Sequence, residues 1–203
     1  MNVADADRVK DRFSTVYITI VSIFLGLAME DLYSKFGSIE EPDFYSYVIV
    51  MLVSLLVINL WIAYSNMAIS IRLIPIPMDA FMVFGSIMGL YLLNSMIFRP
   101  AYEFFYVHGV FNFGSALVTW YHVKRALSDE HIDFDPGLFR PVYALNIAIF
   151  VVSILVAVIL QFQLVGKTVE AVLAGLVLLC PIGWLWVFWA NFKRAFPVFA
   201  YRL

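Results

Sequence analysis

The sequence predicts an all-α, polytopic membrane protein with six transmembrane helices. Hydrophobic residues make up 63% of the 203 residues, and charged residues only 14%, whereas a soluble domain carries about 25% charged residues. Six runs with few or no charges are long enough to cross a hydrocarbon layer of about 30 Å. These runs cover residues 13–29, 44–71, 80–98, 104–122, 142–166 and 171–192. We therefore expect one transmembrane domain, residues 1–203, embedded in a lipid bilayer.

The placement of basic residues predicts the orientation. If the N-terminus is cytoplasmic, ten of the thirteen Lys and Arg residues fall on the cytoplasmic side, and only Lys35, Arg99 and Lys167 fall outside. An excess of Lys and Arg marks the cytoplasmic side of a membrane protein. We expect an integral, multi-pass protein of the bacterial inner or plasma membrane with both termini in the cytoplasm.

The first run, residues 13–29, carries two stripes at helical spacing. The polar stripe is Thr15, Thr19, Ser22 and Gly26, and the apolar stripe is Val16, Ile20, Ile23 and Leu27. Such a mixed face suits either a close helix contact or a pore wall with an apolar constriction. Glu30 and Asp31 follow and begin an acidic segment. This segment is either a solvated loop or a vestibule that concentrates cations.

The second and third runs carry packing and turn signals. Residues 44–71 exceed the thickness of a bilayer, so this helix should tilt or project beyond it. Pro75 and Pro77 then force an extended turn, because proline lacks an amide donor and disfavours helix in the residue before it. Gly85 and Gly89 lie four residues apart in the third run, 80–98, and predict a close approach to a neighbouring helix.

The fourth run, residues 104–122, carries the most regular polar pattern. The polar residues are His108, Asn112, Ser115, Thr119 and His122. Their spacing places them within roughly an 80° arc of one helix face. Two interpretations stay open. The stripe either bonds this helix to its neighbours, at about 0.6 to 2 kcal/mol per bond, or faces a solvated path or ligand site.

Two later features complete the pattern. The acidic loop 128–137 has oxygen ligands at alternate positions but lacks the glutamate that closes a calcium loop, so we expect no metal site there. The fifth run, 142–166, is rich in Ile and Val. In the sixth run, 171–192, Pro181 and Gly183 predict a kink.

Few residues could carry chemistry. Only His108 and His122 are titratable within the runs, apart from carboxylates at their ends, and no paired carboxylates or catalytic motifs occur. We therefore expect neither an enzyme nor a nucleic-acid partner. The two histidines have the spacing used for two stacked haems, but a second helix with its own pair is missing. We expect no cofactor.

The start of the first run resembles a motif of lysosomal and bacterial six-helix potassium channels, in which Arg is followed by Phe-Ser-Asp. Phe13 and Ser14 match this motif, Arg8 is one place out of register, and Thr15 stands where the family has Asp. The resemblance covers about fifteen residues and the six-helix architecture. It implies that the first helix lines the pore of a tetramer.

By this resemblance, Ile20 takes the place of the constriction residue, and Ile23 and Leu27 continue that face. Thr19 and Ser22 lie beside the gate. The polar stripe of the fourth run does not line the pore and bonds its helix to the neighbouring helices. We thus expect a homo-oligomer, a tetramer, that conducts monovalent cations of the potassium type, with Glu30 and Asp31 in its vestibule. The alternative is a non-channel membrane component, either a small-molecule transporter or a partner subunit. A haem or quinone carrier is a third option.

Overall fold

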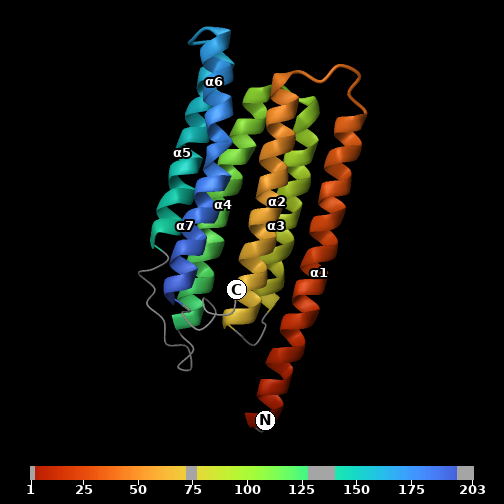
Figure 1. Ribbon diagram of the computed structural model, residues 1–203, viewed down its shortest axis with the longest axis vertical. Helices are drawn as coiled ribbons and strands as arrows, with labels where there is room; N and C mark the ends of the chain where they lie inside the picture. Colours follow the sequence, from red (N-terminus) through yellow and green to blue (C-terminus); the bar gives the residue numbers. More distant parts are fainter. Residues whose placement is uncertain (1–2, 72–76, 128–139, 196–203) are drawn as a thin grey trace.

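The computed structural model describes residues 3–71, 77–127 and 140–195, which form one bundle of helices (Figure 1). The helices are α1 (Val3–Gly37), α2 (Phe44–Ile71), α3 (Pro77–Ser95), α4 (Ala101–Leu127), α5 (Arg140–Phe162), α6 (Lys167–Val177) and α7 (Leu179–Ala195), and a 3-10 helix, η1 (Met96–Phe98), precedes α4. No strand occurs in these ranges. The predicted all-α class is confirmed.

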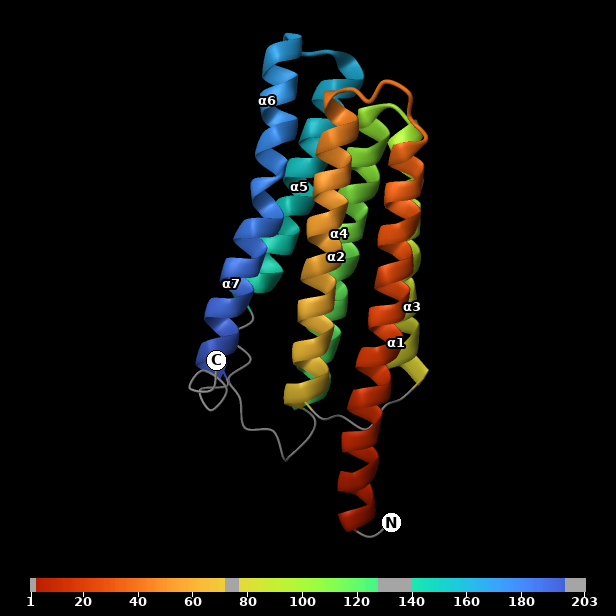
Figure 2. The same cartoon turned by 45° about the vertical axis from the view of Figure 1, so that its right-hand side comes forward.

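The helices are ordered across the bundle as Figures 1 and 2 show. α1 lies at one edge, α5 with α6 and α7 lies at the other, and α2, α3 and α4 lie between them. α1 packs on α2 and α3, and α4 makes its most extensive contact with α5. Successive long helices alternate in direction, so α1 begins at the end of the bundle where α7 ends.

The surface of the bundle is apolar. Phe104 and Phe105 of α4 are fully buried in the core, whereas large apolar side chains such as Phe81, Met88 and Trp186 are more than half exposed. Apolar groups that face outward on every side are unfavourable in water and favourable against lipid tails. The protein therefore presents a surface suited to a bilayer.

Five helical segments are long and apolar enough to cross a membrane. They are Thr15–Gly37, Phe44–Ser65, Met78–Phe98, Arg140–Phe162 and Lys167–Ala190. α4, which contains the expected span 104–122, is not among them. It runs alongside the others, but its His, Asn, Ser and Thr residues lower its mean hydropathy. The five segments are compatible with an integral, multi-pass membrane protein.

Several helices extend beyond the expected runs or end before them, and at two of these ends the contacts or the backbone give the reason. α1 continues to Gly37, eight residues past the expected end at 29. Asp31 and Lys35, four residues apart, form an ion pair of 2.8 Å along this extension, which favours continued helix. α5 ends at Phe162 instead of 166, because Gln163 has a φ of 50° and turns the chain.

The sixth expected run is divided into α6 and α7. The interruption lies at Leu178, three residues before Pro181. Proline cannot donate to the carbonyl four residues earlier, here that of Val177, so regular helix is lost at that turn. The predicted irregularity is present, one turn earlier than the proline itself.

Glycine brings α4 close to its neighbours. A Cβ on Gly109 would lie 3.0 Å from Ile154 Cδ1 and 3.3 Å from the Phe150 carbonyl oxygen of α5. On α3, a Cβ on Gly89 would lie 2.7 Å from the Phe111 ring, whereas Gly85 has nothing within 4 Å. The predicted notch on α3 therefore exists at Gly89 alone, and the sequence analysis missed the closer backbone approach at Gly109.

Gly109→Ala should destabilise the protein by about 1 to 3 kcal/mol, because its methyl group would press on the Ile154 side chain and on the Phe150 carbonyl of α5 at the same time. Gly114→Ala is the matched control on the same helix, since nothing lies within 4 Å of its Cβ position. The midpoint of thermal unfolding in detergent measures both. Equal midpoints for the two variants would contradict the close α4–α5 contact.

Candidate functional site

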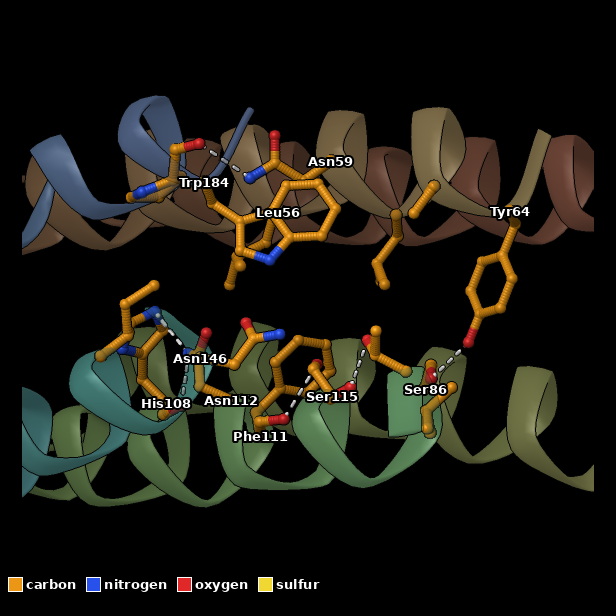
Figure 3. Close-up of a pocket in the computed structure, with 16 residues that line it drawn as sticks. Leu56, Asn59, Tyr64, Ser86, His108, Phe111, Asn112, Ser115, Asn146 and Trp184 are labelled. Carbon is orange, nitrogen blue, oxygen red and sulfur yellow. Dashed lines mark hydrogen bonds between the residues drawn. The ribbon is translucent and has the colours of Figure 1, made fainter. Parts of the chain in front are cut away.

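A cavity with a mainly apolar wall and several polar side chains lies in the middle of the bundle between α2, α3, α4, α5 and α7 (Figure 3). Its volume is about 50 Å³, which holds roughly three water molecules or one solute of a few non-hydrogen atoms. Its polar lining residues are Asn59, Tyr64, Ser86, His108, Asn112, Ser115, Thr119 and Asn146. Such a concave site with a few convergent polar groups is the usual form of a small-molecule site.

The cavity wall carries no formal charge from acidic or basic side chains. None of the described residues that line it is Asp, Glu, Lys or Arg. A charged ligand would lose its hydration shell on entry and find no opposite charge to replace it. The wall is therefore better suited to a neutral solute.

The polar stripe of α4 forms one wall of this cavity. Four of its members border the space: His108, Asn112, Ser115 and Thr119. Ser115 Oγ donates to the Phe111 carbonyl at 3.1 Å and Thr119 Oγ1 to the Ser115 carbonyl at 2.8 Å. His122 is buried outside the cavity, with Nδ1 2.8 Å from the Val118 carbonyl. Most of the stripe bonds within α4 and faces the cavity, and does not bond to a neighbouring helix.

His108 is the exception, because it joins α4 to α5. Its Nδ1 lies 2.9 Å from Ser153 Oγ, and its Nε2 lies 3.2 Å from Asn112 Nδ2. Asn112 Nδ2 also donates to the His108 carbonyl at 2.8 Å, which identifies this amide atom as the nitrogen. Nε2 must therefore accept, so Nδ1 carries the proton and donates to Ser153. His108 is a neutral imidazole with both ring nitrogens bonded.

The opposite wall comes from α2 and α7, and Ser86 of α3 lies beside the α4 stripe (Figure 3). Asn59 Nδ2 donates to the Pro181 carbonyl at 3.1 Å, which ties α2 to the irregular turn of α7. Tyr64 hydroxyl lies 2.7 Å from Ser86 Oγ, which itself donates to the Met82 carbonyl at 3.0 Å. Because the Ser86 hydrogen is used in that bond, Tyr64 is the donor to Ser86.

Two buried amide atoms at the cavity have no protein partner. Asn59 Oδ1 and Asn146 Nδ2 are unpaired, and their residues are 4% and 1% exposed. An unpaired buried polar group costs about 1 to 3 kcal/mol. Figure 3 shows the two residues on opposite sides of the space. The Asn146 amide points into this space, whereas Asn59 Oδ1 points away from it, so one unpaired donor is left for whatever occupies the cavity.

The residues proposed for the pore gate lie elsewhere, on the outer face of α1. Ile20, Ile23 and Leu27 are 41%, 57% and 45% exposed and face away from the bundle. Thr19 and Ser22 donate to carbonyls one turn earlier in α1, and Ser22 also accepts from Trp61 Nε1 at 3.0 Å. Ser22 therefore contacts α2, while the three apolar residues are open in a single chain.

The two vestibule residues differ. Glu30 is exposed, but Asp31 pairs with Lys35 and accepts from Asn94 Nδ2 at 3.0 Å. Asn94 Nδ2 also donates to the Ala28 carbonyl at 2.7 Å, so it fastens α3 to α1. Asp31 therefore has a structural role that the sequence analysis did not anticipate.

Some sequence-based sites lie beyond what the structure describes. Phe13 and Ser14 fall within α1, but their side chains are outside the described part. The acidic loop 128–137 lies outside the described residues. Within the described residues, no group of three His, Cys, Asp or Glu side chains gathers to hold a metal.

Part of the site was not found from the sequence. The polar stripe of α4 is visible as a spacing pattern, but Tyr64, Ser86 and Trp184 line the cavity without any periodic signal of their own. Trp184 lies across the cavity from Asn112 (Figure 3). Which of these residues meet depends on which helices pack together, and a single sequence does not reveal that packing.

Ser153→Ala should destabilise the protein by about 1 to 3 kcal/mol, because the His108 Nδ1 proton would be buried without an acceptor. Ser115→Ala is the control. Its hydroxyl bonds only to a carbonyl of its own helix, so its removal leaves no donor unpaired. Thermal unfolding in detergent compares the two variants, and an equal loss in both would contradict the assigned His108 bonding.

No protein-family model matches the sequence, and comparison with curated proteins and with solved structures finds no similar protein. The cavity and its unpaired amide donor are therefore the observations from which a function is inferred.

Proposed function

We propose that the protein is a multi-pass membrane transport protein that binds a small polar solute in the cavity between α2, α3, α4, α5 and α7. The observation that carries this proposal is an unpartnered amide donor, Asn146 Nδ2, in a mainly apolar cavity whose wall also carries four polar side chains of α4. Polar groups inside a membrane bundle are expensive, and they commonly mark a substrate pathway.

The polarity of α4 supports the proposal. This helix is too polar to qualify as a span by hydropathy alone, yet it runs through the bundle with α2, α3 and α5. A polar helix is tolerated at membrane depth where its polar side faces protein or a cavity. We propose α4 as the fourth of six crossings, with both termini in the cytoplasm of a bacterial cell.

Transport suits the cavity better than catalysis. His108 is the conventional acid or base among the lining residues, and both of its ring nitrogens are already bonded. The same bonding leaves no free nitrogen on His108 for haem iron. A site that holds a solute by hydrogen bonds alone can bind and release it without chemical change.

Ala63→Leu tests this function by filling the cavity from α2. The added carbons should make solute binding in the cavity less favourable by about 1.4 kcal/mol or more. This change in free energy corresponds to a fall in solute flux of about tenfold or more. Light scattering of proteoliposomes under gradients of urea or glycerol measures entry of neutral solutes, and an ion-sensitive dye measures entry of potassium.

Ala148→Leu on the exposed side of α5 is the matched control and should leave flux unchanged. The proposal is wrong if vesicles with the natural protein are no more permeable than empty vesicles to every solute tested. It is also wrong if flux occurs but Ala63→Leu and Ala148→Leu affect it equally.

The second candidate is an oligomeric potassium-type channel, favoured by the outward apolar face of α1. Ile20, Ile23 and Leu27 are exposed in the single chain and must meet either lipid or further copies. Several copies around an axis, a tetramer in the related channel architecture, would turn this face into a ring. A ring of apolar side chains closes a pore by dewetting.

Ile20→Asn separates the two candidates. In a channel gated at this ring, a polar side chain should wet the constriction and raise potassium flux into proteoliposomes several-fold. Ile147→Asn, at a similarly exposed position on α5, is the control. If both variants conduct no more than the natural protein, the α1 face contacts lipid and the channel candidate fails.

A further inference from the structure

We propose that the solute recognised by the cavity is a small primary amide, of the carboxamide or urea class. This inference rests on the proposed function, because it specifies the ligand of the same cavity. It follows from a count of which hydrogen-bonding atoms in the wall are still free to bond.

The free atoms in the α4 wall are acceptors. The Ser115 and Thr119 hydroxyl hydrogens are used on carbonyls of α4, so these oxygens offer only lone pairs to the cavity. Asn59 Oδ1 is also unpaired, but it points away from the space (Figure 3) and does not add to these acceptors. A ligand that meets the α4 wall therefore needs N–H or O–H donors.

Two donors point into the space, the Trp184 indole nitrogen and the amide nitrogen of Asn146 (Figure 3). Asn146 Nδ2 is unpaired and lies on the opposite side of the space from Asn59 (Figure 3). It requires an acceptor on the ligand, and it would repel a cation. A primary amide has one carbonyl oxygen and at least two N–H donors in a plane, which matches this arrangement.

Size and charge agree with the same ligand class. About 50 Å³ accommodates a molecule of a few non-hydrogen atoms. The absence of acidic and basic lining residues favours a neutral ligand. The aromatic rings of Trp184 and Phe111 lie on opposite sides of the cavity and present their edges to it (Figure 3).

The test compares three probes of similar size that each carry a methyl group. Acetamide has both donors and an acceptor, acetone has the acceptor alone, and methylammonium has donors and a positive charge. Saturation-transfer NMR on the full-length protein in lipid nanodiscs detects each methyl signal, and empty nanodiscs correct for binding to lipid. A ligand this small binds weakly, so the titration extends from roughly ten micromolar into the millimolar range.

Acetamide should bind, and acetone should bind at least about tenfold more weakly, because the buried acceptors of the wall would be left unpaired. Asn146→Leu should weaken acetamide binding. Asn94→Leu is the matched control, because Asn94 is also a buried asparagine with an unpaired Oδ1 but lies outside the cavity. The comparison of probes on the natural protein remains decisive even if a variant fails to fold.

Three results would overturn the amide assignment. Acetone that binds as well as acetamide shows that the free acceptors do not select the ligand. Methylammonium or potassium ions that displace acetamide show a cation site, which leaves a solute cavity but not an amide site. If no probe binds and Ala63→Leu also leaves flux unchanged, the proposed function fails together with this inference.

Discussion

The structure depends on one constraint: polar groups of a helix inside an apolar bundle must find partners without water. α4 carries five polar side chains on one face, and each unsatisfied group in hydrocarbon costs several kcal/mol. Back-bonding to its own carbonyls satisfies Ser115 and Thr119, and His108 bonds to Ser153 of α5. These bonds allow α4 to lie among five segments that are apolar enough to cross a membrane.

The same constraint explains why the cavity lies where it does. Gly109 lets α4 approach the α5 backbone closely, and His108 fixes that contact with a directional bond. Facing the stripe, α2 and α7 meet at an irregular turn, where Asn59 bonds the Pro181 carbonyl and does not reach α4. The polar stripe and the irregular turn therefore enclose a space that the side chains leave incompletely filled.

Much of the fold follows from the sequence, and less of the site does. The length of the apolar runs predicts the helices, and the spacing from His108 to His122 predicts one polar face. The sequence does not say which residues meet that face, because Tyr64 and Trp184 reach the cavity only through the pairing of helices. The extension of α1 was missed because the Asp31–Lys35 pair and Asn94 offset charges that normally end an apolar span. Ile20 of α1 is exposed in the single chain.

The most direct test of the central claim is a cryo-electron microscopy structure of the protein in lipid nanodiscs at a resolution that shows ordered water. We expect α4 to have its polar face turned inward, with density for water or solute within hydrogen-bonding distance of Asn146 Nδ2. A closed, empty core in which that amide bonds to protein, or an α4 whose polar face meets lipid, would contradict the account.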